Sequence, residues 1–150
     1  WHSHNYNYLY IVFRSNNLMF QYTFKIYYED TDSGGVVYYA NYLKFIERAR
    51  TEMINELGFT LTTLLKDYDR LFLVKKIECD YIEPCKLEDR LNVQSRVLLL
   101  KNASFELEQN ILKQNNFIFR SKILMVCVNS RGAPCKIPSE LHSLMKNKDG

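Results

Sequence analysis

The sequence predicts an α+β fold in which a single antiparallel sheet curls around one long helix. One strand-like segment precedes the longest helical pattern of the chain, and four strand-like segments follow it. The 150 residues, of which 47% are hydrophobic, suit one domain with a substantial core. We therefore expect a single domain over residues 19–150. Residues 1–18, which begin with Trp rather than Met, are expected to be an N-terminal extension, either a leader or a segment foreign to the native protein, and the alternative is a genuine extra strand.

The first strand is expected over residues 21–28, where aromatic and aliphatic side chains occupy alternate positions. Asp, Ser and Gly in residues 29–35 favour turns and end it. Residues 38–57 form the expected helix, with apolar side chains on one stripe, and Gly58 supplies its C-cap. The order of strand, acidic turn and helix start places carboxylates beside the positive end of a helix dipole, where backbone N–H groups bind oxygen atoms.

The second half of the chain predicts four strands in sequence, joined by short polar turns as in an antiparallel meander. Their expected ranges are residues 71–82, 90–100, 103–112 and 117–128. Pro84 indicates a bulge or a sheet edge nearby, because proline donates no ladder hydrogen bond. The connection at residues 60–70 is expected to hold one helical turn. One helix covers only one face of a sheet, so we expect dimerisation to extend the sheet or protect its edges.

Composition excludes several classes of function. The formal charge of +3 and the pI near 8.6 are too mild to indicate nucleic-acid binding, although they suit a phosphorylated small ligand. The four cysteines lie 6, 42 and 8 positions apart, which matches no zinc or CxxC spacing, so free thiols in a reducing cytoplasm are expected. No apolar run approaches the roughly 20 residues that cross a bilayer. Neither a metal site nor membrane insertion is expected.

A close resemblance to the YbgC-like acyl-CoA thioesterases is carried by residues 28–38 (YEDTDSGGVVY), the pair Asn41-Tyr42 and residues 47–52 (ERARTE). It continues through residues 72–76, Pro84, Asp89 and residues 126–128, so that it covers residues 20–145. These enzymes have the hotdog fold and are related to 4-hydroxybenzoyl-CoA thioesterase. The resemblance implies a five-stranded antiparallel sheet wrapped around one long central helix, assembled into homodimers or homotetramers.

The resemblance also implies roles for individual residues. Asp32, the second aspartate of the Asp-x-Asp pair, would be catalytic as nucleophile or general base, and the sequence leaves these two roles open. The backbone amide near Tyr39 would polarise the thioester carbonyl. Many relatives have His in place of Tyr39, whereas the 4-hydroxybenzoyl-CoA enzymes have Tyr. The further expected substrate-binding residues are Asp30, Gly34, Gly35, Val36, Val37, Tyr38, Lys75 and Lys101, the lysines as contacts for coenzyme A phosphates.

The implied function is hydrolysis of an acyl-CoA thioester, or of an acyl carrier protein thioester, to a free carboxylate and a thiol. No cofactor is expected, because coenzyme A is part of the substrate. The alternative is a hotdog protein without hydrolytic activity that binds acyl chains or scaffolds envelope and lipid-synthesis partners, as the association of this family with the Tol-Pal system suggests. Without the resemblance, Asp30 and Asp32 are read more simply as residues that shape a turn.

Overall fold

The computed structural model describes residues 18–146. The strands are β1 (Phe20–Lys25), β2 (Leu71–Tyr81), β3 (Arg90–Leu100), β4 (Ser104–Lys113) and β5 (Asn116–Val128). The helical segments are the single 3-10 turn η1 (Tyr28–Asp30), α2 (Asn41–Glu56), α3 (Leu61–Tyr68) and α4 (Ser139–Met145). The expected extension over residues 1–18 falls outside the described residues except for Leu18, so the domain boundary stays a prediction.

The five strands form one antiparallel sheet in the order β1-β3-β4-β5-β2. The expected meander holds for β3, β4 and β5. It is wrong for β2, which does not pair with β3 but lies beside β5 at the opposite edge. The edge of β3 that a hairpin would need is taken by β1, where Gln21 lies opposite Gln94. Both β1 and β2 are therefore edge strands.

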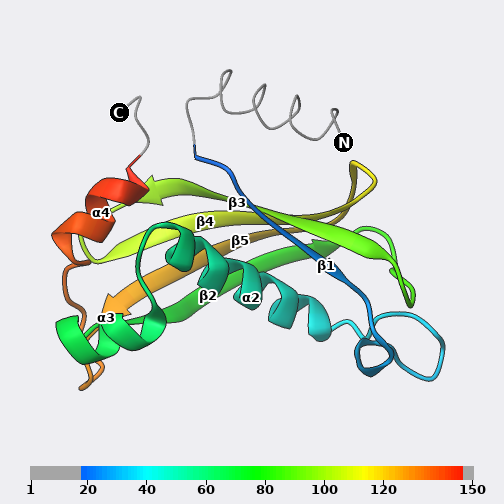
Figure 1. Ribbon diagram of the computed structural model, residues 1–150, viewed down its shortest axis with the longest axis horizontal. Helices are drawn as coiled ribbons and strands as arrows, with labels where there is room; N and C mark the ends of the chain where they lie inside the picture. Colours follow the sequence, from blue (N-terminus) through cyan, green and yellow to red (C-terminus); the bar gives the residue numbers. More distant parts are fainter. Residues whose placement is uncertain (1–17, 147–150) are drawn as a thin grey trace.

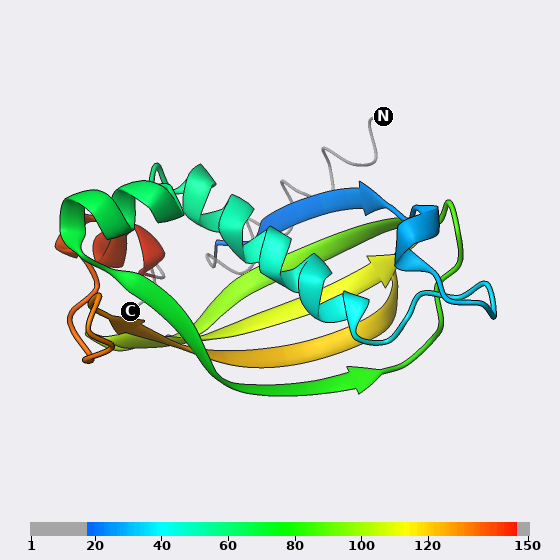
Figure 2. The same cartoon turned by 90° about the horizontal axis from the view of Figure 1, so that it is seen from below.

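The helix α2 lies along the concave face of the curved sheet, as Figures 1 and 2 show from two directions. Its apolar stripe is buried against the strands, as the sequence predicts. The buried side chains include Tyr42, Phe45, Ile46, Ala49 and Met53. Gly58 follows the helix with a φ of +93°, which a residue without a Cβ adopts freely. The predicted five-stranded antiparallel sheet around a central helix is confirmed.

Three local boundaries differ from the sequence prediction. Strand β1 ends at Lys25 because the Tyr27 amide donates to the Asp30 carboxylate at 2.9 Å and the chain bends into η1. Helix α2 begins at Asn41, three residues later than expected. The connection after it contains the two-turn helix α3 rather than one turn. In α3 the Thr60 hydroxyl accepts from the Thr63 amide at 3.0 Å, which is an N-cap that favours a longer helix.

The two ends of the sheet carry different structures (Figure 1). At one end lie the loop over residues 26–40 and the connection between β2 and β3. At the other end lie α3, α4 and the turn between β3 and β4, where the Ile137 amide donates to the Asn102 carbonyl at 2.8 Å. Within residues 18–146 no helix has the length and apolar character that a membrane span requires.

Candidate active site

The candidate site begins at Asp30, which organises the loop between β1 and α2. Its buried carboxylate accepts a hydrogen bond from the Tyr27 amide. Its backbone carbonyl accepts two more, from the Tyr38 amide at 3.1 Å and from Nδ2 of Asn41 at 2.9 Å. Asn41 is itself buried. Asp30 thus joins the start of the acidic turn to the first residue of α2. Its hydrogen bonds are made to other residues of the chain, as in a structural role.

Asp32 lies exposed at the tip of a tight turn. Its amide donates to the Val36 carbonyl at 2.9 Å, and its own carbonyl accepts from the Gly35 amide at 3.0 Å. Oδ1 accepts from the Gly34 amide at 2.8 Å, whereas Oδ2 has no hydrogen-bond partner within residues 18–146. The carboxylate is therefore oriented by one oxygen and keeps the other available for a substrate or a water molecule.

The two glycines fit this turn for different reasons. Gly35 has a φ of +82°, a conformation that strains residues with a Cβ. A Cβ on Gly34 would lie 3.2 Å from Oδ1 of Asp32, closer than an ordinary van der Waals contact. Gly34 therefore allows the carboxylate to fold back over the backbone, and Gly35 allows the chain to turn.

The turn is fastened to the connection between β2 and β3. The buried Val37 donates its amide to the Cys85 carbonyl at 2.9 Å, and Val36 forms an isolated antiparallel bridge with Lys86. Lys86 is exposed, which places a cation next to the acidic turn. The sequence reasoning missed Lys86, because only the bridge across 50 residues of chain brings it to this loop.

Helix α2 begins without a side-chain cap. Its N-cap residue is Ala40, and no side chain accepts from the amides of the first turn. Tyr39 directly precedes Ala40, and its amide donates no hydrogen bond to any of residues 18–146. Within the first turn, backbone carbonyls accept from the Asn41 and Leu43 amides. The unused Tyr39 amide, next to the positive end of the 16-residue helix, forms a favourable site for a developing negative charge.

A pocket of about 260 Å³ opens beside this helix start. Its lining residues are Val37, Tyr39, Tyr42, Tyr81, Ile82, Glu83 and Pro84. Tyr81, at the end of β2, is a residue that the sequence reasoning missed. Its hydroxyl donates to the Tyr39 carbonyl at 2.9 Å, and burial raises the pKa of its phenol, which keeps the phenol a proton donor at neutral pH.

Of the residues predicted from the sequence, the loop brings together Asp30, Asp32, both glycines and the segment of residues 36–39. It does not bring Lys75 or Lys101 there. Lys75 lies on β2 six residues before Tyr81, about 20 Å away at the usual rise of a strand. Lys101 follows the far end of β3, about 35 Å from the strand's start beside the site. Within one protomer, both lysines therefore lie away from the Asp32 turn, at distances that only an extended ligand spans.

Comparison with known proteins identifies the family. A sequence profile of the thioesterase-like superfamily matches residues 27–144. The acyl-CoA thioesterase YbgC of Haemophilus influenzae is 39% identical over 123 residues, which cover 81% of this chain and 90% of that protein. The acyl-CoA thioesterase YbgC of Helicobacter pylori is 34% identical, with 81% of this chain and 96% of that protein covered.

Solved structures agree with this assignment. A probable thioesterase from Bartonella henselae superposes with a TM-score of 0.78 at 31% identity, covering 81% of this chain and all of that one. A gentisyl-coenzyme A thioesterase gives a TM-score of 0.74 at 32% identity, with 81% and 98% of the two chains covered. The profile match spans the acidic turn, the helix start and strands β2 to β5. The chain belongs to the YbgC family of acyl-CoA thioesterases, within the thioesterase-like superfamily.

Proposed function

We propose that this chain hydrolyses acyl-CoA thioesters to a free carboxylate and coenzyme A, with Asp32 as the group that delivers oxygen to the acyl carbon. The observation that carries the proposal is the pairing of an exposed, oriented carboxylate with an uncapped helix start in one loop. The names of the relatives in the YbgC family support the same activity.

Two routes are consistent with the position of Asp32. In the first, its carboxylate attacks the thioester carbon, the C–S bond breaks, the thiolate leaves, and water hydrolyses the resulting mixed anhydride. In the second, the carboxylate takes a proton from a water molecule as that water attacks the same carbon. In both routes the carbonyl oxygen gains negative charge, which the Tyr39 amide and the dipole of α2 stabilise. In the first route, the solvent oxygen enters Asp32 if water attacks the Asp32 carbon of the anhydride, and it enters the released carboxylate if water attacks the acyl carbon.

The proposal assigns Tyr39 a backbone role. Tyr39 is 63% exposed, and Tyr81 holds its carbonyl. This hydrogen bond restrains the backbone on the C-terminal side of the Tyr39 amide, so the backbone rather than the ring suits oxyanion binding. Asp30 supports this geometry through its contacts with Tyr38 and Asn41. Gly34, Gly35, Val36, Val37 and Tyr38 then shape the entrance around the acyl carbon.

The proposal includes a homodimer, alone or as half of a tetramer. The outer edge of β2 is unpaired within residues 18–146, and Leu73 and Val74 on that strand are 50% and 43% exposed. An edge of this kind is protected by a second copy. A second protomer also offers the route by which Lys75 or Lys101 would contact coenzyme A phosphates, whereas Lys86 lies near the site of its own chain.

We place this activity in the cytoplasm and include acyl carrier protein as a second carrier of the acyl group.

The experiment is a thiol-release assay with a panel of short, long and aromatic acyl-CoA thioesters, run with catalytic amounts of protein. The parent is expected to release thiol from at least one class, and Asp32→Asn is expected to lower kcat by 10² or more while it still folds. An Asp32→Asn protein that turns over like the parent excludes the mechanism. Tight acyl-CoA binding with no turnover by the parent instead supports the acyl-binding scaffold.

A further inference from the structure

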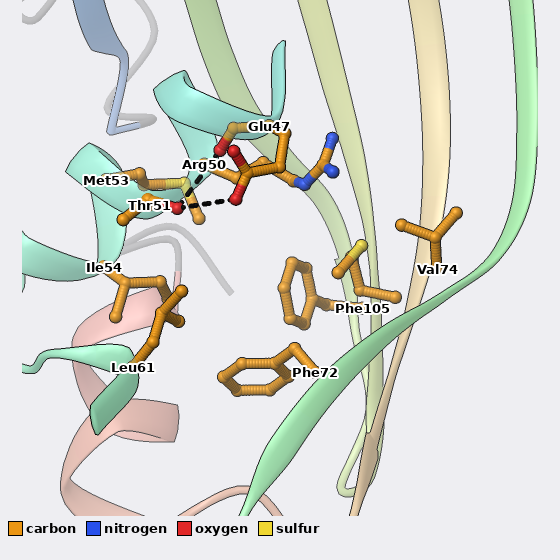
Figure 3. A pocket seen from close by; sticks show the side chains of 10 residues that line it. Glu47, Arg50, Thr51, Met53, Ile54, Leu61, Phe72, Val74 and Phe105 are labelled. Atoms are coloured by element: carbon orange, nitrogen blue, oxygen red, sulfur yellow. Dashed lines mark hydrogen bonds between the residues drawn. The ribbon is translucent and has the colours of Figure 1, made fainter. Parts of the chain in front are cut away.

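A second pocket lies between the C-terminal half of α2, the start of α3 and strands β2, β4 and β5 (Figure 3). Its volume is about 210 Å³. Most of its walls are apolar, formed by Met53, Ile54, Leu61, Phe72, Val74, Phe105 and Met125. It shares no lining residue with the pocket at the helix start. Along α2, Arg50 in this pocket lies eight residues beyond Tyr42 in the other, about 12 Å at the rise of an α-helix.

The feature that distinguishes this pocket is the cation of Arg50. Burial lowers the pKa of its guanidinium, which nonetheless stays charged because arginine is not deprotonated in proteins. Nη1 donates to Oε1 of Gln109 at 3.0 Å. None of the salt bridges among residues 18–146 includes Arg50. The other N–H groups of Arg50 make no hydrogen bond within residues 18–146 and are reached by solvent, so a partly desolvated cation with free donors lines an otherwise largely apolar cavity.

Glu47 forms no salt bridge with Arg50, although its negative charge partly offsets the lowering of the Arg50 pKa by burial. Oε1 of Glu47 accepts from the Thr51 hydroxyl at 3.1 Å, and that hydroxyl also lies 3.2 Å from the Glu47 carbonyl. In Figure 3 the guanidinium of Arg50 points toward the sheet, away from the Thr51 hydroxyl. Glu47 is an exposed lining residue, so solvent screens part of its repulsion of an incoming anion.

We propose that this pocket binds a small carboxylate with a compact apolar body, about the size of benzoate, and that Arg50 pairs with its carboxylate. The guanidinium fork matches a carboxylate in a bidentate pair. Phe72, Phe105 and Met125 provide the ring and sulfur contacts that aromatic bodies favour. A cavity of about 150 Å³ holds benzene in another protein, so the larger volume here leaves room for the carboxylate.

The test is a titration of the full chain with benzoate, followed by NMR chemical shifts and calorimetry without any acyl-CoA. Benzoate is expected to bind, and Arg50→Met is expected to weaken that binding at least tenfold. Arg48→Met is the matched control, because Arg48 is an exposed arginine of the same helix outside the pocket, and it should bind as the parent does. Glu47→Gln should bind severalfold more tightly, because it removes a negative charge and keeps an acceptor for Thr51.

A second variant addresses the pocket itself. Leu61→Phe adds bulk from an exposed position at the start of α3, leaves Arg50 in place, and should abolish benzoate binding by filling the cavity. The proposal is overturned if the parent does not bind benzoate, if Arg50→Met binds as well as Arg48→Met, or if neutral benzyl alcohol binds as tightly as benzoate. Because binding is measured without a thioester, these outcomes are independent of whether the chain hydrolyses acyl-CoA.

Discussion

The hydroxyl of Tyr81 donates a 2.9 Å hydrogen bond to the backbone carbonyl of Tyr39, which lies 42 positions earlier in the chain. The bond joins the end of edge strand β2 to the peptide that precedes the N-cap of α2. The Tyr81 ring is itself held by edge contacts with Tyr42 at 5.3 Å and Phe119 at 5.2 Å between ring centroids. Tyr81 is therefore a positioning residue for the helix start, in addition to its place in the pocket wall.

Substitution of Tyr81 by Phe should lower kcat about 2- to 10-fold with little change in KM. Phe keeps the ring contacts and loses the hydrogen bond, which is worth about 0.5–1.5 kcal/mol, so the Tyr39 peptide is held less firmly in the transition state. The measurement is steady-state thiol release with the best acyl-CoA of the panel. Tyr28→Phe is the control, because Tyr28 is 81% exposed and lies outside the pocket. A loss confined to KM would exclude a positioning role.

The turn around Asp32 should be sensitive to its backbone conformation. Gly35→Ala forces a Cβ onto a φ of +82° and should lower the free energy of unfolding by about 1–2 kcal/mol. It should also lower kcat at least tenfold, because the turn that orients the carboxylate relaxes. Gly132→Ala is the matched control, since Gly132 has a φ of +81° in the turn after β5. Equal activity losses in the two variants would contradict the prediction, because backbone strain far from Asp32 would then reduce turnover as much as strain in the Asp32 turn.

The sequence predicts those structural features that depend on residues close together in the chain. The bounds of β3 are those expected, and the bounds of β4 and β5 differ by one residue, because alternating side chains and polar turns define a strand locally. The place of β2 in the sheet was predicted wrongly, since it depends on β1 occupying the free edge of β3. No local pattern distinguishes these two arrangements.

The same limit applies to the site. The acidic turn and helix start lie within residues 28–41, so a contiguous motif carries them. Tyr81, Lys86 and Arg50 reach their positions through contacts with distant segments, such as the bridge between Val36 and Lys86. Their residue types are common on exposed strand and helix positions, so the sequence contains no signal that separates them from their neighbours.

The buried Gln109 should be important for stability. Its side chain receives a hydrogen bond from Arg50 and donates to the Ile46 carbonyl at 3.0 Å and to the Ser95 hydroxyl at 2.9 Å. Gln109→Leu leaves these buried groups unpaired and should lower the free energy of unfolding by about 2–3 kcal/mol. Urea denaturation measures this difference. Gln94→Leu, on the neighbouring strand, is the control and should change the free energy of unfolding by less than about 0.5 kcal/mol. An equal change in the two variants contradicts a role for the hydrogen bonds of Gln109.

Stability should fall in alkaline solution because of thiols and phenols in the core. Burial raises the pKa of Cys127 from 9.0 to about 11, and it also raises the pKa of Cys85 and Tyr42. Between pH 9 and 11 the unfolded chain has lost the Cys127 proton while the native chain keeps it, so the free energy of unfolding decreases as the pH rises. Below pH 9 both states hold that proton, and this thiol adds no slope.

The expected decrease for Cys127 alone is about 1–2 kcal/mol between pH 8.5 and 11, measured by urea denaturation at each pH. Cys127→Ala should show a smaller decrease than the parent, because one of the groups with a raised pKa is gone. Cys135→Ala, which removes a thiol outside the core and keeps Cys127, should retain most of the decrease, because burial raises the Cys127 pKa more than the charge of Cys135 does. Identical pH profiles for Cys127→Ala and the parent would rule out the Cys127 thiol as a source of the alkaline loss, because its proton would then be released at the same pH in both states.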